Sequence, residues 1–238
     1  MSIRSQIKDL RIRRKMRREK PHLWTIPTAG VAYVQNYKVA TRSIRLALGK
    51  YLLEQDGTDL TYDDISKQMM LSLRKTHSGF YTIGKYKSMN PDISTFTFVR
   101  NPLARLYSCY VNKITDRKVS GGKDEFAHWG ITLDTSFENF VRIIADTPDE
   151  AADRHFRSQS WFVSNGDELV VDYIGKLESL SDDWKTLQER HGFPSLPHIN
   201  KSTPSKTHIR DRYTKETYAM ALSRYEKDIE LLGYTEDV

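Results

Sequence analysis

Two short β-type runs, each followed at once by a helical pattern, constrain this chain more than any other feature. Residues 31–35 (Val-Ala-Tyr-Val-Gln) lead through a loop to apolar residues at helical spacing over 44–52. Residues 93–99 lead to Asn101 and Pro102, a good N-cap residue and a residue suited to the first helical turn. Alternation of strands and helices favours an α/β domain with a central parallel sheet flanked by helices.

The rest of the chain carries weaker signals for the same architecture. Residues 56–91 are interpreted as a looser region. We then expect a helix after the capping box at 135–138, a strand at 169–175, a helix that Ser181 caps and Gly192 ends, and a last helix over about 215–232.

Positive charge is concentrated in one segment. Residues 1–20 hold nine of the 37 Lys and Arg residues and two of the 31 acidic residues, so the net charge of +6 belongs to this segment. We therefore divide the chain into a basic N-terminal arm at 1–22 and a single domain at 23–238. Such an arm can bind an anionic polymer or an anionic membrane surface, and the alternative is a solvated tail. Specific nucleic-acid binding is not expected, because no recognition fold accompanies the arm.

Composition limits the compartment and the chemistry. The longest uncharged stretch, residues 21–37, contains two prolines and several polar residues, so it cannot serve as a membrane span. Cys109 is the only cysteine, so no internal disulfide can form and no clustered Cys/His zinc site is available. We expect a cytoplasmic protein, which the arm could hold peripherally at a membrane.

The loop after the first β-type run has the layout of an anion-binding cradle. Backbone N–H groups and the dipole at a helix start stabilise an anion. Lys38 lies just before the helix, and Thr41 and Ser43 add hydroxyl groups. The loop has no glycine between Asn36 and Leu48, so it is not the glycine-rich loop of nucleoside triphosphatases. The alternative is an ordinary loop with an exposed lysine.

Arg100 puts a second cation at the end of the next β-type run. Ligands of open α/β sheets bind beyond the carboxyl ends of the strands. Lys38 and Arg100 would therefore lie at one edge if their strands are parallel neighbours, which predicts a ligand with two separated anionic groups. We interpret Arg105 as a surface charge, and Tyr107 and Tyr110 as core residues.

These segments together resemble a known family. Residues 37–43 (Tyr-Lys-Val-Ala-Thr-Arg-Ser) are similar to the 5′-phosphosulfate loop of carbohydrate sulfotransferases, the membrane-associated Golgi type and its bacterial relatives. Residues 98–110 resemble the 3′-phosphate segment of that family. Further similar elements follow in the family's order at 155–159, 172–178, 196–202 and 225–234. Arg42 and Asn101 depart from the family's usual residues.

The resemblance implies a P-loop-kinase-like sulfotransferase fold and a single sulfotransferase-like catalytic domain at 23–238. It also implies 3′-phosphoadenosine 5′-phosphosulfate as donor co-substrate, no metal, and a hydroxyl acceptor such as a carbohydrate. Lys38 would stabilise the oxygen that leaves with the 5′-phosphate, while Arg100 and Ser108 would bind the 3′-phosphate. The predicted donor-binding residues are Lys38, Val39, Ala40, Thr41, Arg42, Ser43, Arg100, Ser108 and Lys201.

The acceptor hydroxyl needs a general base, and histidine is the usual choice near neutral pH. His77 is the first candidate, because its place 23 residues before Arg100 resembles that of the base in the uronyl 2-O-sulfotransferase branch of the family. His155 is the second, through its similar His-x-Arg-x-Gln element, with a structural or acceptor-binding role as the alternative. His191 precedes Gly192 and is expected to serve a helix end.

Two other functions stay open beside sulfuryl transfer in this interpretation. One is a nucleotide-dependent phosphotransferase on a related fold. The other is a non-catalytic module that binds a polyanion or a membrane through residues 1–20.

Overall fold

The computed structural model describes residues 14, 16, 18–197 and 208–235. The chain divides into two compact units, each with its own hydrophobic core. The sheet unit comprises Lys20–Arg100 and Phe162–Pro204. The helical unit comprises Met1–Glu19, Asn101–Trp161 and Ser205–Val238.

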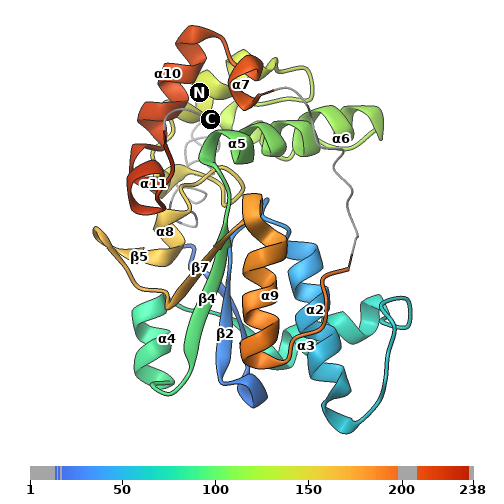
Figure 1. The fold of residues 1–238 in the computed structure, drawn as a ribbon. Coiled ribbons are helices and arrows are strands. Elements are labelled where there is room, and N and C mark those ends of the chain that lie inside the picture. Colours follow the sequence, from blue (N-terminus) through green and yellow to red (C-terminus); the bar gives the residue numbers. More distant parts are fainter. Residues whose placement is uncertain (1–13, 15, 17, 198–207, 236–238) are drawn as a thin grey trace. The chain divides into compact units, whose positions relative to one another are not determined.

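A five-stranded sheet in the order β3-β1-β2-β4-β7 forms the frame of the sheet unit (Figure 1). Strands β2, β4 and β7 are parallel, which agrees with the predicted α/β class and its parallel centre. A separate hairpin pairs β5 with β6. The strands are β1 (His22–Ile26), β2 (Val31–Gln35), β3 (Ser78–Phe80), β4 (Ser94–Val99), β5 (Ser164–Asn165), β6 (Glu168–Leu169) and β7 (Tyr173–Lys176).

Strand β1 is the main departure from the expected order, which began at residue 31. A 3-10 turn at Pro27–Ala29 and Gly30, whose φ is 65°, reverse the chain between β1 and β2. The resulting pairing is antiparallel and sets His22 opposite Gln35. Because β1 also pairs with β3, β2 is an interior strand with neighbours on both sides.

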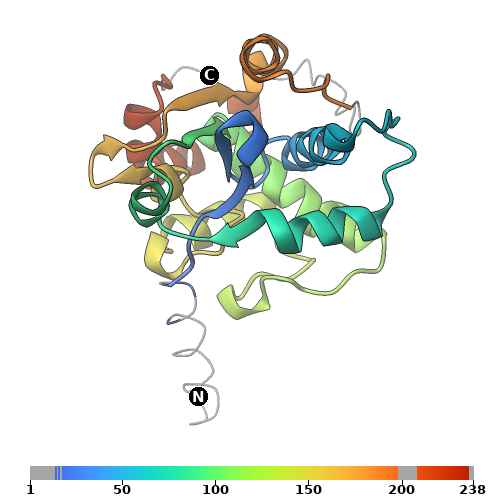
Figure 2. The same ribbon diagram turned by 90° about the horizontal axis from the view of Figure 1, so that it is seen from below.

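Among its described residues, the sheet unit wholly contains four helices: α2 (Thr41–Leu53), α3 (Lys67–His77), α4 (Ile83–Met89) and α9 (Leu180–His191). Helices α2, α3 and α9 supply side chains to the core beside Trp24, Tyr33 and Phe96 on one face of the sheet. On the other face, Tyr86 of α4 hydrogen-bonds Thr25. Figure 2 shows α3 leading directly into β3.

Two of the expected boundaries in this unit were wrong. The region 56–91 contains two helices and a strand rather than a loose connection. Helix α9 begins after Ser179, not Ser181, because the Asp183 carboxylate accepts the Lys176 N–H and the Ser179 hydroxyl hydrogen. Gly192 ends this helix at φ 71°, as predicted.

The helical unit is built on α5, whose start was predicted correctly. Asn101 Oδ1 accepts the N–H groups of Leu103 and Ala104 at 3.0 Å each. At α7 the cap is Ser136, one residue after the expected Thr135, and the expected last helix is broken at Tyr225. The segments are α5 (Pro102–Tyr110), a π-helical stretch (Val111–Thr115), α6 (Asp116–Val119), α7 (Phe137–Ala145), α10 (Lys215–Arg224) and α11 (Glu226–Leu231). Helix α8 (Ser160–Val163) crosses the boundary between the units.

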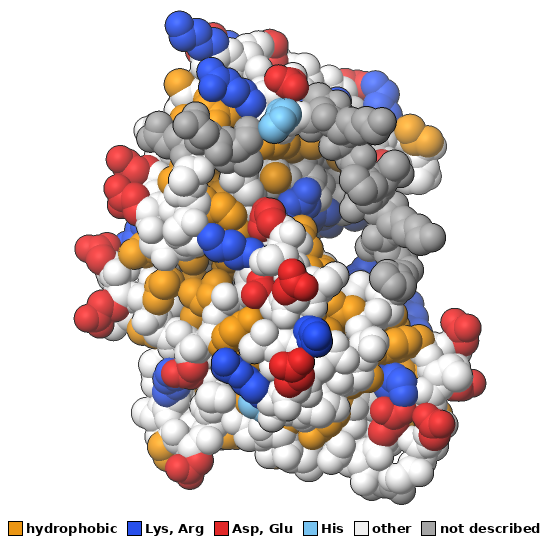
Figure 3. Space-filling model, in the orientation of Figure 1, with side chains coloured by type: hydrophobic (Ala, Val, Ile, Leu, Met, Phe, Trp, Pro, Cys, Tyr) orange, Lys and Arg blue, Asp and Glu red, His pale blue; other side chains and the backbone are white. Residues whose placement is uncertain are grey.

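Short 3-10 turns complete the two units. They are Glu54–Asp56, Ala127–Trp129, Asp149–Ala151, Leu177–Ser179 and Ile209–Arg212. Figure 3 shows acidic and basic side chains interspersed on one face of the molecule, in keeping with the near neutrality of the chain after residue 20. Among the described residues, no helix has both the length and the apolar composition needed to cross a bilayer.

Candidate functional site

The carboxyl ends of β2 and β4 bring the two predicted cations to one edge of the sheet. The strands are parallel neighbours, with Val34 opposite Thr97 near their ends. Lys38 follows β2 by three residues and Arg100 follows β4 directly. The condition on which the two-point anion site depended is therefore met. Both side chains are half-buried.

The loop between β2 and α2 has an uncommon backbone. Lys38 has φ 69° and Ala40 has φ 42°, and they are the only non-glycine residues at positive φ in the described part of the chain. A left-handed conformation crowds Cβ against the backbone and costs about 1–2 kcal/mol per residue. Such strain is typical of functional loops, where surrounding contacts maintain it.

Two side chains hold this strained loop in place. Val39 is fully buried in the core of the sheet unit, so it contributes its backbone, not its side chain, to the edge. Asn36 Nδ2 donates to Thr97 Oγ1 and to the Phe98 carbonyl, both at 3.2 Å, which ties the loop to β4. The sequence analysis missed Asn36, although its place directly after a buried β-type run was a usable signal.

The start of α2 is left open toward the sheet edge. Its N-cap, Ala40, has no side chain that can accept a hydrogen bond, and the first turn contains no acidic residue. Thr41 Oγ1 donates to the Asn36 carbonyl at 2.6 Å and closes the loop. The Thr41 hydroxyl hydrogen is therefore used within the loop, which leaves the Thr41 backbone N–H as the donor for a ligand. This arrangement of N–H groups and helix dipole suits a phosphate.

Buried polar atoms without partners accompany the loop. Gln35 Oε1 and Asn36 Oδ1 have no hydrogen-bond partner among the described residues. Native proteins leave few buried polar atoms unpaired, because each costs about 1–3 kcal/mol. Both oxygens lie at the same sheet edge as the open helix start, so the edge is built with unmet hydrogen-bonding capacity.

Further positive charge lies along α2. Arg42 is exposed and Ser43 is half-buried. Arg45 stacks over the Trp24 ring at 5.1 Å, and burial lowers its pKa, with the charges of Arg74 and Arg42 lowering it further. An arginine remains charged in spite of such a shift. The helix start therefore has a positive surrounding that favours an anion.

His77, the first candidate base, is the last residue of α3 and is half-buried. Ser78, which follows it, pairs with Trp24, whereas Phe80 pairs with His22 at the level of the last residue of β2. The His77 backbone is thus three residues, or about 10 Å, short of the carboxyl edge. Among the described histidines, His22 has its backbone at that edge.

His155, the second candidate, belongs to the helical unit. Its Nδ1 lies 2.6 Å from Asp153 Oδ1, a pairing that orients the imidazole. Burial lowers the pKa of His155, although Asp153 acts in the opposite direction. The pKa of Asp153 is also below its usual value, since the contacts with His155 outweigh the effect of burial. The lowered pKa of His155 favours the neutral imidazole, the form that a base requires.

The remaining predicted residues have diverse positions. Ser108 is half-buried on α5 of the helical unit, and Lys201 lies outside the described residues. The interpretation of Arg105 as a surface charge was wrong: it is 1% exposed and donates to the carbonyls of Arg157 and Arg154 at 2.8 and 3.0 Å. It holds the backbone around the His155 element.

Two of the sequence elements that resemble the family, at 155–159 and 225–234, are hydrogen-bonded to each other inside the helical unit. The Asp228 carboxylate accepts the N–H groups of Gln159 and Ser160 at 2.8 and 2.7 Å. Tyr225 donates its hydroxyl hydrogen to the Phe156 carbonyl at 2.6 Å. The element at 155–159 and the terminal Tyr225 to Asp228 element therefore support each other structurally.

The described end of the basic arm contacts the helical unit. Arg157 donates to the Met16 carbonyl at 2.8 Å and lies 3.3 Å from Glu19 Oε2. Met16 is 8% exposed. The solvated-tail interpretation is contradicted at Met16, while residues 1–13, 15 and 17 of the arm lie outside the described part.

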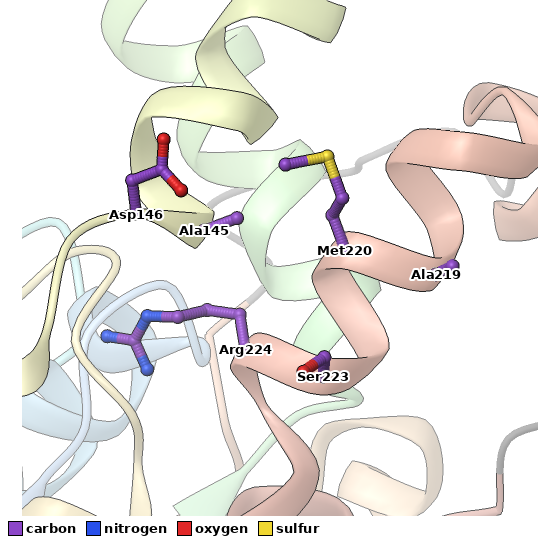
Figure 4. A pocket seen from close by; sticks show the side chains of 6 residues that line it. All are labelled: Ala145, Asp146, Ala219, Met220, Ser223 and Arg224. Atoms are coloured by element: carbon purple, nitrogen blue, oxygen red, sulfur yellow. The ribbon is translucent and has the colours of Figure 1, made fainter.

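One pocket of about 610 Å³ opens in the helical unit. Figure 4 shows Ala145 and Met220 pointing toward one another across it, with Arg224 nearby. The Arg224 guanidinium already pairs with Asp149 and hydrogen-bonds Ser158. None of the predicted donor-binding residues lines this pocket, so we do not assign it to the donor.

A model of the sulfotransferase family matches residues 21–235, nearly the whole chain. The chain therefore belongs to the sulfotransferase family, as the resemblance implied. Its mixed α/β architecture agrees with the fold of that family, and membership identifies the chemistry as sulfuryl transfer by a transferase. No curated protein and no solved structure matches the chain.

Proposed function

We propose that the protein transfers a sulfuryl group from 3′-phosphoadenosine 5′-phosphosulfate to a hydroxyl group of a carbohydrate. The observation that carries the proposal is the shared sheet edge, where a strained, uncapped helix start beside Lys38 neighbours Arg100 on the next parallel strand. A donor with anionic groups at both ends requires two such points.

The residues present fit this donor. The N–H groups of 41–43 and the Lys38 ammonium match a 5′-phosphosulfate, and no acid in the first turn of α2 opposes it. Arg100 offers a guanidinium for the 3′-phosphate, the group that distinguishes this donor from ATP. Fully ionised partners of this kind form the stronger class of hydrogen bonds.

Charge stabilisation and positioning carry much of the rate in this mechanism. Lys38 offsets the negative charge that develops on the oxygen leaving with the 5′-phosphate, while the α2 N–H groups hold that phosphate still. The acceptor oxygen attacks opposite the leaving oxygen, roughly in line. A histidine removes the acceptor proton. His77 and His155 both stay candidates, and the roles of Ser108 and Lys201 and the absence of a metal requirement stay predictions.

The site of action is also part of the proposal. A cytoplasmic location rests on the single cysteine, and the basic segment at 1–20 would give a peripheral association with an anionic polymer or membrane. Salt-dependent sedimentation with anionic vesicles, compared with neutral ones, tests the association.

The direct test is transfer of labelled sulfate from the donor to a panel of glycans and small alcohols. Lys38→Ala is expected to lower kcat by about 10²–10³-fold. Arg100→Ala is expected to weaken binding of adenosine 3′,5′-bisphosphate by about 10–100-fold. Lys185→Ala and Arg190→Ala on the exposed surface of α9 are matched controls.

Three results decide between the alternatives. Preference for ATP with a dependence on Mg²⁺ would reject sulfuryl transfer in favour of phosphoryl transfer. A His77→Ala protein at full rate would remove His77 as the base and leave His155→Ala to be measured. Loss of polyanion binding on deletion of 1–20, with no transfer by the full chain, would favour the binding module.

A further inference from the structure

An exposed aromatic ring stands on the edge strand of the sheet, level with the end of β2. Phe80 of β3 pairs with His22 of β1, and His22 pairs with Gln35, the last residue of β2. Paired residues of antiparallel strands project to the same face. The row from Phe80 through His22 to Gln35 therefore runs across one face toward the Lys38 loop.

That face is the one on which α2 packs. Trp24 and Tyr33, which form the next row on the same face, belong to the core that includes Ile44 of α2. Arg45 of α2 lies over the Trp24 ring. Phe80 and the open start of α2 consequently share both a face and an edge of the sheet.

The Phe80 ring is held rigidly. It stacks on the His22 imidazole with centroids 4.5 Å apart and planes 14° apart. Ser78 donates its hydroxyl hydrogen to the Arg74 carbonyl at 2.7 Å, so at the 2.8 Å contact its oxygen accepts a hydrogen bond from the His22 Nε2–H group. His22 is 4% exposed while Phe80 is 48% exposed, so one side of the ring is supported and much of the rest faces solvent.

The order of the strands assigns this ring to the acceptor side. If the donor extends from Arg100 after β4 to Lys38 after β2, its transferable group lies at the Lys38 end. The acceptor then approaches from the side of β2 that lies away from β4, because attack is opposite the leaving oxygen. On that side the sheet continues through β1 to β3, about 10 Å from β2.

We infer that Phe80 is the stacking platform for a sugar ring of the acceptor, an inference that rests on the proposed function. The hydrophobic C–H face of a pyranose would lie on the exposed face of the phenyl ring, with a hydroxyl-bearing edge toward the Lys38 loop. A rigid aromatic surface contributes to binding with little loss of conformational freedom on association.

The test compares Phe80→Ala, Phe80→Tyr and Phe80→Trp with Met89→Ala, an exposed apolar residue of α4 outside this row. The Phe80→Ala protein is expected to raise KM for a pyranoside acceptor by roughly 3–10-fold, with kcat little changed. For Phe80→Tyr, Phe80→Trp and Met89→Ala, the KM for the pyranoside is expected to stay within about twofold of the parent value, which is smaller than the change expected for Phe80→Ala. Circular dichroism confirms that each variant folds.

Binding of adenosine 3′,5′-bisphosphate and binding of a glycan panel are measured on the same proteins. Weaker bisphosphate binding by Phe80→Ala would overturn the inference and give the ring to the donor. An unchanged KM for the pyranoside would overturn the inference, and so would an equal rise in KM for a small alcohol without a ring. In either case, sulfate transfer by the parent protein would leave the proposed function intact. If the parent neither binds the bisphosphate nor transfers sulfate, the proposed function fails. Phe80-dependent glycan binding would then still support the platform, and absent glycan binding would overturn it.

Discussion

Replacing Ala40 by glycine separates the backbone strain of the loop between β2 and α2 from the proposed role of that loop in binding the donor. At φ 42° the alanine Cβ is crowded, and its removal relieves about 1–2 kcal/mol. Glycine also gains freedom in the unfolded chain, which costs about 0.4–1 kcal/mol. We therefore expect the free energy of unfolding of Ala40→Gly to be unchanged or raised by up to about 1.5 kcal/mol. Urea unfolding of the full chain at pH 7 measures it.

Binding is expected to move in the opposite direction. A glycine at this position lets the loop leave the conformation that presents the α2 N–H groups, so the affinity for adenosine 3′,5′-bisphosphate should fall about 2–5-fold. Ala29→Gly in the Pro27–Ala29 turn is the matched control, since this residue has no positive φ and its replacement should cost about 0.5–1 kcal/mol. An equal loss of stability in both variants would refute the strained loop.

Three further predictions concern the helical unit. Asp228→Ala should lower the free energy of unfolding by about 3 kcal/mol, because two buried N–H groups at the start of α8 lose their acceptor; chemical denaturation measures this. Arg105→Met keeps the volume but leaves the buried Arg157 carbonyl and the part-buried Arg154 carbonyl without this donor, so a loss of about 2–3 kcal/mol is expected, and a loss below about 0.5 kcal/mol would contradict the assigned role. His155 has a lowered pKa, so the unfolded state binds its proton more tightly, and stability should fall as the pH drops from about 6.5 through the folded pKa. Thermal melts of His155→Gln should lack the loss of stability that protonation of His155 causes at low pH. A pH profile of stability identical to that of the parent would exclude this contribution of His155.

Local sequence patterns predicted the β2–α2 unit and the β4–α5 unit. Strand β4 and its helix combine β-type alternation, an Asn N-cap and a first-turn proline, all of which act within a few residues, and the structure reproduces them. The parallel pairing of β2 with β4 was only the condition set for a shared edge, and the structure meets it. What these patterns could not provide was the conformation of Lys38 and Ala40, because non-glycine residues rarely adopt positive φ.

The missed elements depend on contacts distant in sequence. Leu73 is the only buried residue of helix α3, so the sequence has no apolar stripe that would predict this helix. Strand β7 begins at Tyr173 instead of residue 169 because Asp172 turns its carboxylate to the Thr95 N–H and hydroxyl, 77 residues earlier. Arg105 looked like a surface charge for a similar reason: the carbonyls that it satisfies come from residues about 50 positions away, which no local pattern reveals.

The two halves of the sheet edge that carries Lys38 and Arg100 are expected to form at different times during folding. The strands of the β1–β2 hairpin are joined by four residues, so it can assemble in about 1–10 μs from neighbouring sequence. Strand β4 reaches β2 only after a loop of about 60 residues closes, an entropically slower event. The Lys38 half of the edge is therefore expected to have its framework before Arg100 arrives, and mutations in the hairpin should slow refolding more than mutations at the β2–β4 seam.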